Sequence, residues 1–419
     1  MVNPNESPTV VLPRAVDTSG AKAAQPRLNG VDLARALAVL GMFVAHIGPL
    51  MLDPHAGTAA GVLAAFGNGH ASILFATLAG VSLALLTGGS QPHDGLALRR
   101  DRIRIAVRAA ILFVLGMALT QLGTPVMVIL SFYAVYFLLA LPVLRLSPAV
   151  LAVLAGIWAV VAPLLSFFIR RSLGEQTAGG ALSFSDLATP SDAGAGLLRL
   201  LLDGAYPVLT WMPFVLVGLA VGRLDLRSTA VRLRLLGTGV GLAVLGSGGS
   251  WLALHVFGGL QALTPILDAL RPFADQVGKT PLELLQMVSF GTVPTSNPAL
   301  LLLDAPHSGT TFEIVGSTGF ALAVLALCLF VADRLRTPLA PLTAVGALAL
   351  TVYTLQVVAL KFVIDANSQS LAAHAWLPLI AFVLVAVLFC GLWRPLLGRG
   401  PLERVLHWTS TRASTALAR

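Results

Sequence analysis

Four histidines stand where the sequence predicts the outer ends and outer loops of membrane-spanning helices. They are His46, His55, His70 and His307. A histidine titrates near neutral pH, so it can act as a general base, a nucleophile or a metal ligand. Any one of them alone is more often a surface or hydrogen-bonded side chain, but four on one membrane face suggest a shared site. The sequence contains no HExxH or His-x-His spacing, so we expect no metal site.

A pair of opposite charges, Asp32 and Arg35, opens the first long apolar segment. Residues three apart face the same side of a helix and can form an ion pair. Ionisable groups inside a membrane span are costly to bury and are functional candidates by default. Two interpretations stay open: an ion pair that sets the depth and register of the helix, or a site for an anionic head group or phosphate.

A dense group of cations precedes the third apolar segment. It comprises Arg99, Arg100, Arg102, Arg104 and Arg108. Guanidinium groups match phosphate geometry, so the group could bind the phosphates of a cofactor. The interpretation that we favour is a topology determinant that faces anionic lipids.

Several aromatic and polar side chains could contact a substrate. Tyr206 and Trp211 suit either an interfacial aromatic belt or a sugar or lipid site. Tyr133, Tyr353 and Gln356 lie within apolar segments, where a polar group needs a partner. These three side chains could line the interior of a helical bundle, or they could simply form hydrogen bonds between helices.

The segment PHSGT contains a histidine next to a hydroxyl group. Ser308 follows His307 directly, and adjacent residues rarely form a nucleophile–base pair, so we do not predict a serine hydrolase. Asp304 and Glu313 flank the segment and could orient the His307 imidazole.

The composition defines the setting of all these residues. Of the 419 residues, 56% are hydrophobic and only 11% are charged, against about 45–50% and about 25% in soluble domains. Apolar runs of about 20 residues recur along the chain, which is typical of a polytopic helical membrane protein rather than a barrel. The net charge of +8 comes mainly from arginines in short loops, so we do not expect nucleic-acid binding. Cys328 and Cys390 lie inside apolar runs and indicate packed core thiols.

We therefore predict an all-α polytopic membrane protein with about ten transmembrane helices in one bundle. The arginine-rich loops fall on one side of the bundle, so the positive-inside rule predicts that both termini are cytoplasmic and that the protein lies in the cell inner (plasma) membrane. Residues 1–27 are predicted as a disordered cytoplasmic tail, 28–396 as one transmembrane domain, and 397–419 as a cytoplasmic C-terminal tail. The predicted spans are 31–51, 59–87, 105–122, 125–144, 148–169, 200–221, 235–257, 312–332, 340–363 and 375–393.

Two predicted outer segments are long. They cover residues 170–199 and 258–311, and long loops often carry function. The second is expected to contain a short re-entrant or interfacial helix near Pro281 to Ser289. Four glycines, at 237, 239, 241 and 246, suit close packing between helices.

The first span, GVDLARALAVLGMFVAHI, resembles the start of the heparan-alpha-glucosaminide N-acetyltransferase-like transmembrane acyltransferases. The family pattern has an aspartate, then an arginine three residues later followed by glycine, then an asparagine or histidine near the helix end. The corresponding residues here are Asp32, Arg35, Ala36 and His46, so the glycine is absent. SILFATLAGVSLALL looks like the next family helix. PLTAVGALALTVYTLQ, GRGPLERVLHW, PHSGT and YPVLTWMPFVLVGLAVGRLDL look like the YeiB-like branch, in an actinobacterial-type member. The resemblance covers most of the chain after residue 27.

The resemblance implies acyl transfer across a membrane, from cytoplasmic acetyl-CoA to a hydroxyl or amine of a sugar or glycolipid outside. His55 is the nearest match to the catalytic histidine of the family, although the Trp and the Asp–Leu pair that follow it there are replaced by Ala56, Gly57 and Thr58. Under this hypothesis His55 acts as base or acyl carrier, and His46, His70 and His307 orient the acceptor or substitute for it. The CoA-binding candidates are Asp32, Arg35, Arg99, Arg100, Arg102 and Arg104, and the acceptor-binding candidates are Tyr133, Tyr206, Trp211, Ser308, Glu313 and Gln356.

Two other functions remain as alternatives. A transporter or lipid flippase would also place polar groups within spans, but the sequence shows no inverted repeat and no paired broken helices. A non-catalytic membrane scaffold would account for the missing Trp and Asp–Leu pair. The expected partners are membrane lipids and the sugar or glycolipid acceptor, with a homodimer as a further possibility.

Overall fold

The computed structural model describes residues 27–52, 57–174, 180–366 and 374–418. Over these residues the chain forms helices, turns and loops and no strand. His55 and almost all of the predicted N-terminal tail lie outside the described residues. The helical, polytopic class predicted from the composition is confirmed.

Seven helical segments are long and apolar enough to cross a membrane. One of them joins α3 (Thr58–Gly67) to α4 (His70–Leu86) across a short turn. The others are α1 (Asn29–Ile47), α5 (Gly95–Thr120), α7 (Pro148–Leu173), α10 (Thr229–His255), α13 (Thr311–Arg334) and α17 (Leu377–Leu397).

Two further spans are bent. The first combines α8 (Pro190–Leu198) and a π-helical turn (Arg199–Asp203) with α9 (Val208–Gly222), at 53°. The second combines α14 (Ala340–Ala347) with α15 (Ala349–Ala366), at 80°. The sequence-based statement that the chain has no paired broken helices was therefore wrong. The break before α9 is marked by Asp203, Gly204 and Pro207, whereas apolar residues continue across the break between α14 and α15.

By length and composition, the described residues hold one to three fewer spans than the ten predicted. Seven to nine segments qualify among the described residues, and the predicted span 125–144 forms the short helix α6 (Leu130–Ala140). Its 11 residues cover only about 16 Å, roughly half of the hydrocarbon core of a bilayer. The rest of that segment forms the turn before α6 and the 3₁₀ turn Leu141–Val143 after it.

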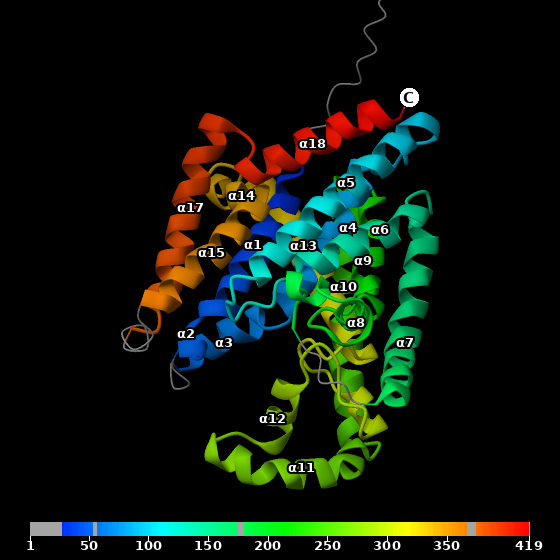
Figure 1. Ribbon diagram of the computed structural model, residues 1–419, viewed down its shortest axis with the longest axis vertical. Coiled ribbons are helices and arrows are strands. Elements are labelled where there is room, and N and C mark those ends of the chain that lie inside the picture. The colour runs from blue at the N-terminus through cyan, green and yellow to red at the C-terminus, as the bar shows by residue number, and fades with distance from the viewer. Residues whose placement is uncertain (1–26, 53–56, 175–179, 367–373, 419) are drawn as a thin grey trace, which may run out of the picture.

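Several helices lie across the ends of the bundle. At one end α11 (Gly259–Gln276) and α12 (Pro281–Val288) run beneath the spans, and α2 (Pro49–Leu52) follows α1 toward this same end (Figure 1). At the other end α18 (Pro401–Leu417) lies over the start of α5. The short helix expected near Pro281 is thus present, whereas α11 was not expected.

The arginine-rich connections gather at the α18 end of the molecule. The described chain both begins, at α1, and ends at this same end (Figure 1). The loop segment 258–311 closes the opposite end. The molecule therefore has a basic end and an end built from long loops, as the distribution of arginines in the sequence indicated.

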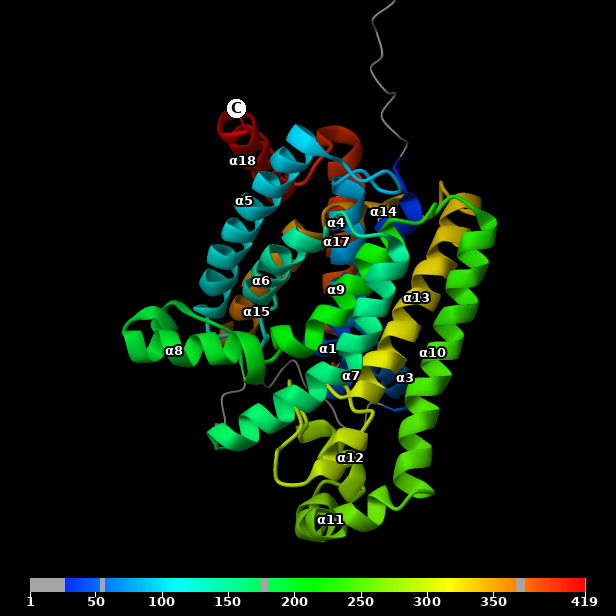
Figure 2. The ribbon, with the colours of Figure 1, turned by 90° about the vertical axis from the view of Figure 1, so that its right-hand side faces the viewer.

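Glycines allow the helices of the core to approach closely. A Cβ atom on Gly218 of α9 would lie 1.9 Å from the carbonyl oxygen of Thr77 on α4. Gly239 and Gly246 of α10 have similar contacts with α13, which runs alongside α10 in Figure 2. A Cβ on Gly237 or Gly241, in contrast, would meet no atom within 4 Å. The packing role predicted for the α10 glycines is therefore correct for two of the four.

Candidate functional site

His307 lies in a loop that turns back into the bundle just before α13. Its φ of 63° is the only positive φ of a non-glycine residue in the described part of the chain. Such a conformation costs free energy and persists only where the surroundings enforce it. Here the Glu313 carboxylate enforces it, because it accepts hydrogen bonds from the backbone N–H groups of His307 and Gly309, both at 3.1 Å. Thr310 begins α13 by capping the Glu313 N–H.

Aromatic side chains surround the His307 imidazole. Trp211 stacks on it at a ring separation of 5.6 Å, Phe290 lies at 4.7 Å, and Tyr206 meets it edge-on at 5.5 Å. His307 is buried, and its Nδ1 atom has no hydrogen-bond partner. Burial lowers the pKa of His307 to about 3. The site therefore holds a neutral imidazole with a nitrogen free to accept or donate a proton.

His46 and His70 approach this loop from the first two spans. A charge on either would lower the pKa of His307 further, so both lie within electrostatic range of it. The His46 Nδ1 atom is 2.7 Å from the Gln356 side-chain nitrogen on α15. His70 packs against Phe320, and the preceding residue, Gly69, touches Pro306. His46 and His70 are thus both near enough to His307 to affect its charge state.

Further polar groups line the interior between α6 and α15. The hydroxyl of Tyr133 and the side-chain oxygen of Gln356 are buried without a hydrogen-bond partner. Tyr353 accepts a hydrogen bond from the Ile129 N–H, and Tyr136 donates one to the Tyr206 carbonyl. Unsatisfied buried polar atoms are costly, so the Tyr133 hydroxyl and the Gln356 oxygen are candidates for a contact with a polar ligand or an ordered water.

Asp304 and Ser308 complete the loop. Asp304 accepts a hydrogen bond of 2.5 Å from Ser247 on α10, and burial raises the pKa of Asp304. The buried Ser308 hydroxyl lies 3.3 Å from the Thr310 hydroxyl. Glu313 bonds to the backbone of the loop rather than to the imidazole, so it orients His307 indirectly.

Asp32 and Arg35 form an ion cluster at the basic end. The buried Asp32 carboxylate contacts Arg27 at 2.6 Å, Arg35 at 2.9 Å and Arg394 of α17 at 3.7 Å. The Arg35 guanidinium also donates to the Ser82 hydroxyl and the Gly346 carbonyl. These bonds connect α1 to α4, α14 and α17. Of the two interpretations left open by the sequence, this geometry favours the structural ion pair over a phosphate site.

The predicted arginine group divides into two faces. Arg99, Arg100 and Arg102 are exposed. Arg104 turns toward α18, where it bonds to Asp101 and to the Ser414 hydroxyl, at 3.5 and 3.2 Å.

Beside Arg104 lies a basic cluster that sequence analysis did not assemble. We use this name for Arg104, Arg108, Arg399 and His407. Burial and the three arginine charges lower the pKa of His407, which places the four groups together. Arg108 donates to the Ser410 hydroxyl on α18, at 3.3 Å. The spacing of four residues between Arg104 and Arg108 was a signal for a shared helix face, but Arg399 and His407 lie about 300 residues further along the chain.

No group of three or more His, Cys, Asp or Glu side chains within the described ranges is arranged to bind a metal ion. The two cysteines, Cys328 and Cys390, are buried and free.

The described chain is thus a multi-pass helical membrane protein with a buried histidine, His307, in a loop that enters the bundle. Residues 27–248 match the family model described as "Heparan-alpha-glucosaminide N-acetyltransferase, catalytic", and residues 284–413 match "Protein of unknown function (DUF418)". A search of curated proteins gave no match. The chain belongs to the heparan-alpha-glucosaminide N-acetyltransferase-like superfamily of transmembrane acyltransferases, in its YeiB-like branch.

Proposed function

We propose that the protein transfers an acetyl group from acetyl-CoA on the cytoplasmic side of the plasma membrane to a hydroxyl or amine of a sugar or glycolipid on the other side. The observation that carries the proposal is the buried, neutral imidazole of His307, whose Nδ1 atom has no hydrogen-bond partner and which lies within electrostatic range of His46 and His70. The matched catalytic family model supports the class of reaction.

The histidine site suits a base that acts on the acceptor. The acceptor oxygen or nitrogen attacks the thioester carbonyl carbon, a new C–O or C–N bond forms, and the C–S bond breaks. A neutral imidazole takes the acceptor proton, which finally passes to the CoA thiolate. His307 and His46 are the described candidates for this base, and Glu313 keeps the His307 loop in position. His55 remains a candidate through the family resemblance, and it lies outside the described residues.

The basic cluster suits the phosphates of the donor. Its positive charge comes from Arg104, Arg108 and Arg399, because the lowered pKa of His407 leaves that imidazole neutral at neutral pH. The Asp101 carboxylate, which pairs with His93 at 2.6 Å, lies close to Arg104 and Arg108. Arg104 and Arg108 are partly buried and Arg399 is exposed, and guanidinium groups attract phosphate. In this proposal the cluster takes the place that sequence analysis gave to Arg35 and to the exposed Arg99, Arg100 and Arg102.

Calorimetry with acetyl-CoA tests the donor site in folded, detergent-solubilised protein. We expect micromolar binding that is weakened about 10²- to 10⁴-fold in the double variant Arg104→Ala/Arg108→Ala, because each of the two lost charge-assisted hydrogen bonds contributes about 1.5–3 kcal/mol. Arg145→Ala is the control, since Arg145 pairs with Asp94 away from the basic cluster. Folded protein that binds no acetyl-CoA at millimolar concentration would sink the proposal.

A separate assay tests the histidine site. It measures the transfer of radiolabel from [¹⁴C]acetyl-CoA to other molecules in membranes that contain the protein. We expect His307→Gln to lower the rate of transfer by about 10²–10⁴-fold, the usual share of a general base, while acetyl-CoA binding stays unchanged. His255→Gln, on the exposed end of α10, is the control. Equal rates in wild type and His307→Gln would remove His307 from the mechanism.

A transporter is the second candidate, and the two bent helix pairs favour it. Broken spans place helix ends inside the membrane, where they bind substrates in many transporters. Flux of a small molecule that persists in His307→Gln, together with no acetyl-CoA binding, would select this function.

A further inference from the structure

The last helix, α18, has large apolar side chains on its outward face and polar side chains on its inward face. Val405 and Trp408 are 51% and 52% exposed. On the opposite face Ser410 and Ser414 are buried and accept hydrogen bonds from two arginines of α5, at 3.3 and 3.2 Å. A surface helix of a soluble protein has the reverse pattern, with its apolar face toward the core. The apolar side chains of α18 therefore have no protein partner in the bundle.

The outward face of α18 is also cationic. Arg404, Trp408 and Arg412 follow one another at four-residue spacing, so they share a helix face, and all three are exposed. The Arg412 guanidinium lies over the Trp408 ring, 4.0 Å from its centroid. Glu403, the one acid within Pro401–Leu417, accepts two hydrogen bonds from Thr351 of α15 on the inward side. The face thus combines an aromatic ring and two arginines, and α18 carries no outward carboxylate.

The position of α18 along α5 places it at the membrane boundary. α18 lies beside the first turns of α5, at the edge of the bundle (Figure 2), and bonds there to Arg104 and Arg108. The uncharged remainder of α5, from Ala109 to Thr120, covers about 18 Å at about 1.5 Å per residue. The hydrocarbon core of a bilayer is about 30 Å thick. The turns of α5 that contact α18 must therefore lie near the head groups and not out in bulk water.

The preceding helix brings a lipid-facing surface to the start of α18. Four leucines of α17 recur at four-residue spacing and are 55–77% exposed: Leu384, Leu388, Leu392 and Leu396. On a helix long and apolar enough to span the membrane, such a stripe faces hydrocarbon. The stripe ends just before the chain turns into α18, so lipid already adjoins the molecule at this point.

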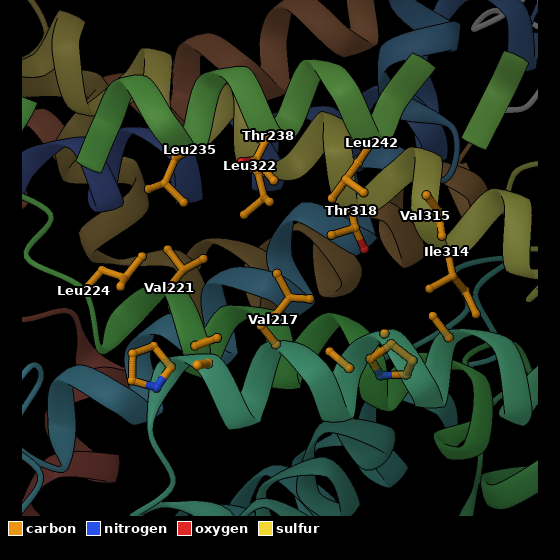
Figure 3. A pocket seen from close by; sticks show the side chains of 18 residues that line it. Val217, Val221, Leu224, Leu235, Thr238, Leu242, Ile314, Val315, Thr318 and Leu322 are labelled. Atoms are coloured by element: carbon orange, nitrogen blue, oxygen red, sulfur yellow. The ribbon is translucent and has the colours of Figure 1, made fainter. Parts of the chain in front are cut away.

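An apolar groove between α7, α9, α10 and α13 provides a contrast (Figure 3). Its volume is about 540 Å³, and its 18 lining residues include no Asp, Glu, Lys, Arg or His. Such a groove can contact acyl chains but cannot distinguish an anionic head group from a neutral one. Selection among head groups requires a surface that combines charge with apolar area, as the outward face of α18 does.

We propose that the outward face of α18 binds anionic phospholipid in the leaflet at the basic end. Arg404 and Arg412 contact head-group phosphates, and Trp408 and Val405 lie at the boundary between head groups and acyl chains, as in interfacial amphipathic helices. Charge complementarity selects lipid over a second copy of this chain, because two such faces would bring like charges together. The inference does not depend on the proposed acyl transfer.

The first test measures the depth of the face in the full-length protein, whose native cysteines are buried. A nitroxide label is attached to Val405→Cys in nanodiscs of phosphatidylcholine and phosphatidylglycerol. We expect oxygen to relax this label more than a water-soluble nickel chelate does. Ser90→Cys, in an exposed loop at the same end, is the control and should respond mainly to nickel. Equal nickel accessibility at the two positions would overturn the inference, and so would efficient disulfide formation between two Val405→Cys chains in proteoliposomes, which would assign the face to a dimer.

The second test measures the preference for head groups. The difference in fluorescence quenching between wild type and Trp408→Phe, with lipids brominated on their acyl chains, reports on Trp408. We expect stronger quenching by phosphatidylglycerol than by phosphatidylcholine, and a preference about fivefold lower in Arg412→Gln, the usual share of one arginine near an anionic surface. Arg271→Gln, which alters an exposed arginine on α11 at the opposite end, is the matched control.

Equal quenching of Trp408 by the two lipids, or an unchanged preference in Arg412→Gln, would refute anionic lipid as the occupant. Acetyl-CoA binding is expected to stay at the wild-type level in Trp408→Phe and Arg412→Gln, because neither residue belongs to the basic cluster. A loss of lipid preference with unchanged acetyl-CoA binding therefore supports a lipid site that is separate from the proposed donor site. A parallel loss of both would overturn that separate site.

Discussion

At the scale of single residues, the most unusual side chain is a histidine kept in a strained backbone conformation inside an aromatic enclosure. The Glu313 carboxylate accepts hydrogen bonds from the backbone N–H groups of His307 and Gly309. These two hydrogen bonds stabilise the positive φ of His307 and offset its strain. Trp211 and Phe290 fix the plane of the ring. The imidazole is therefore positioned before any substrate arrives, as a positioned base must be.

Burial of His307 also predicts how stability depends on pH. The folded pKa of about 3 lies below the ordinary value of 6.5, so between these values the unfolded chain binds a proton that the folded chain excludes. Stability therefore falls as pH decreases below about 6.5, by up to about 1.4 kcal/mol per pH unit from this group. We expect the melting temperature to drop more between pH 7.5 and 5.5 in wild type than in His307→Gln, measured by fluorescence in detergent. An equal drop in both proteins would contradict the burial of a neutral imidazole.

The sequence indicated the polar residues that lie at this candidate site, but not the aromatic residues that enclose them. His46, His70, His307 and Glu313 could be chosen because their residue types are rare in apolar segments. Phe290 could not be chosen, since one phenylalanine among 19 has no distinguishing feature until a loop folds it over a histidine. The basic cluster was missed for the same reason, because it joins residues of α5 with residues near the C-terminus.

At the scale of the helices, glycine contacts decide how the spans pack. The crossing of α4 and α9 brings backbone against backbone at Gly218, so a methyl group there must displace the carbonyl of Thr77. We expect Gly218→Ala to cost about 1–3 kcal/mol, as overpacking does, and to lower the melting temperature. Gly241→Ala is the comparison: its methyl group enters open space, and alanine favours a helix over glycine by about 0.5–1 kcal/mol. A Gly218→Ala protein as stable as Gly241→Ala would refute the close crossing.

Apolar length predicted where helices lie, but not where they break or which loop segments fold. The α14–α15 bend of 80° falls within one continuous apolar run, so composition alone joined the two helices. For α11 the sequence predicted a loop where the structure has a helix, because Pro265 and Pro272 disfavour a helix interior. Leu263 of α11 is buried against Leu285 and Leu300 from the rest of the 258–311 segment, and this packing supports a helix despite its prolines.

At the scale of the whole molecule, the separation of a basic end from a loop-covered end predicts a fixed orientation in the membrane. The exposed residues Ser90 and Lys279 lie at the two ends, and the native cysteines are buried. In intact cells we expect a membrane-impermeant maleimide to label Lys279→Cys and to spare Ser90→Cys, with both labelled after permeabilisation. The reverse pattern would place the arginine-rich end outside and would exclude access of cytoplasmic acetyl-CoA to the basic cluster.

The ion cluster around Asp32 joins parts of the chain that a ribosome makes far apart in time. Arg35 emerges 311 residues before Gly346, whose carbonyl it binds, and at about 5–20 residues per second that interval lasts roughly 15–60 s. During that interval α1 lies in the membrane with the Asp32 carboxylate paired only to Arg27 and Arg35. The bonds to Arg394 and to the Gly346 carbonyl form later. The first helix to be inserted is thus among the last to reach its final partners. Until then its incompletely paired charged groups favour contact with the insertion machinery.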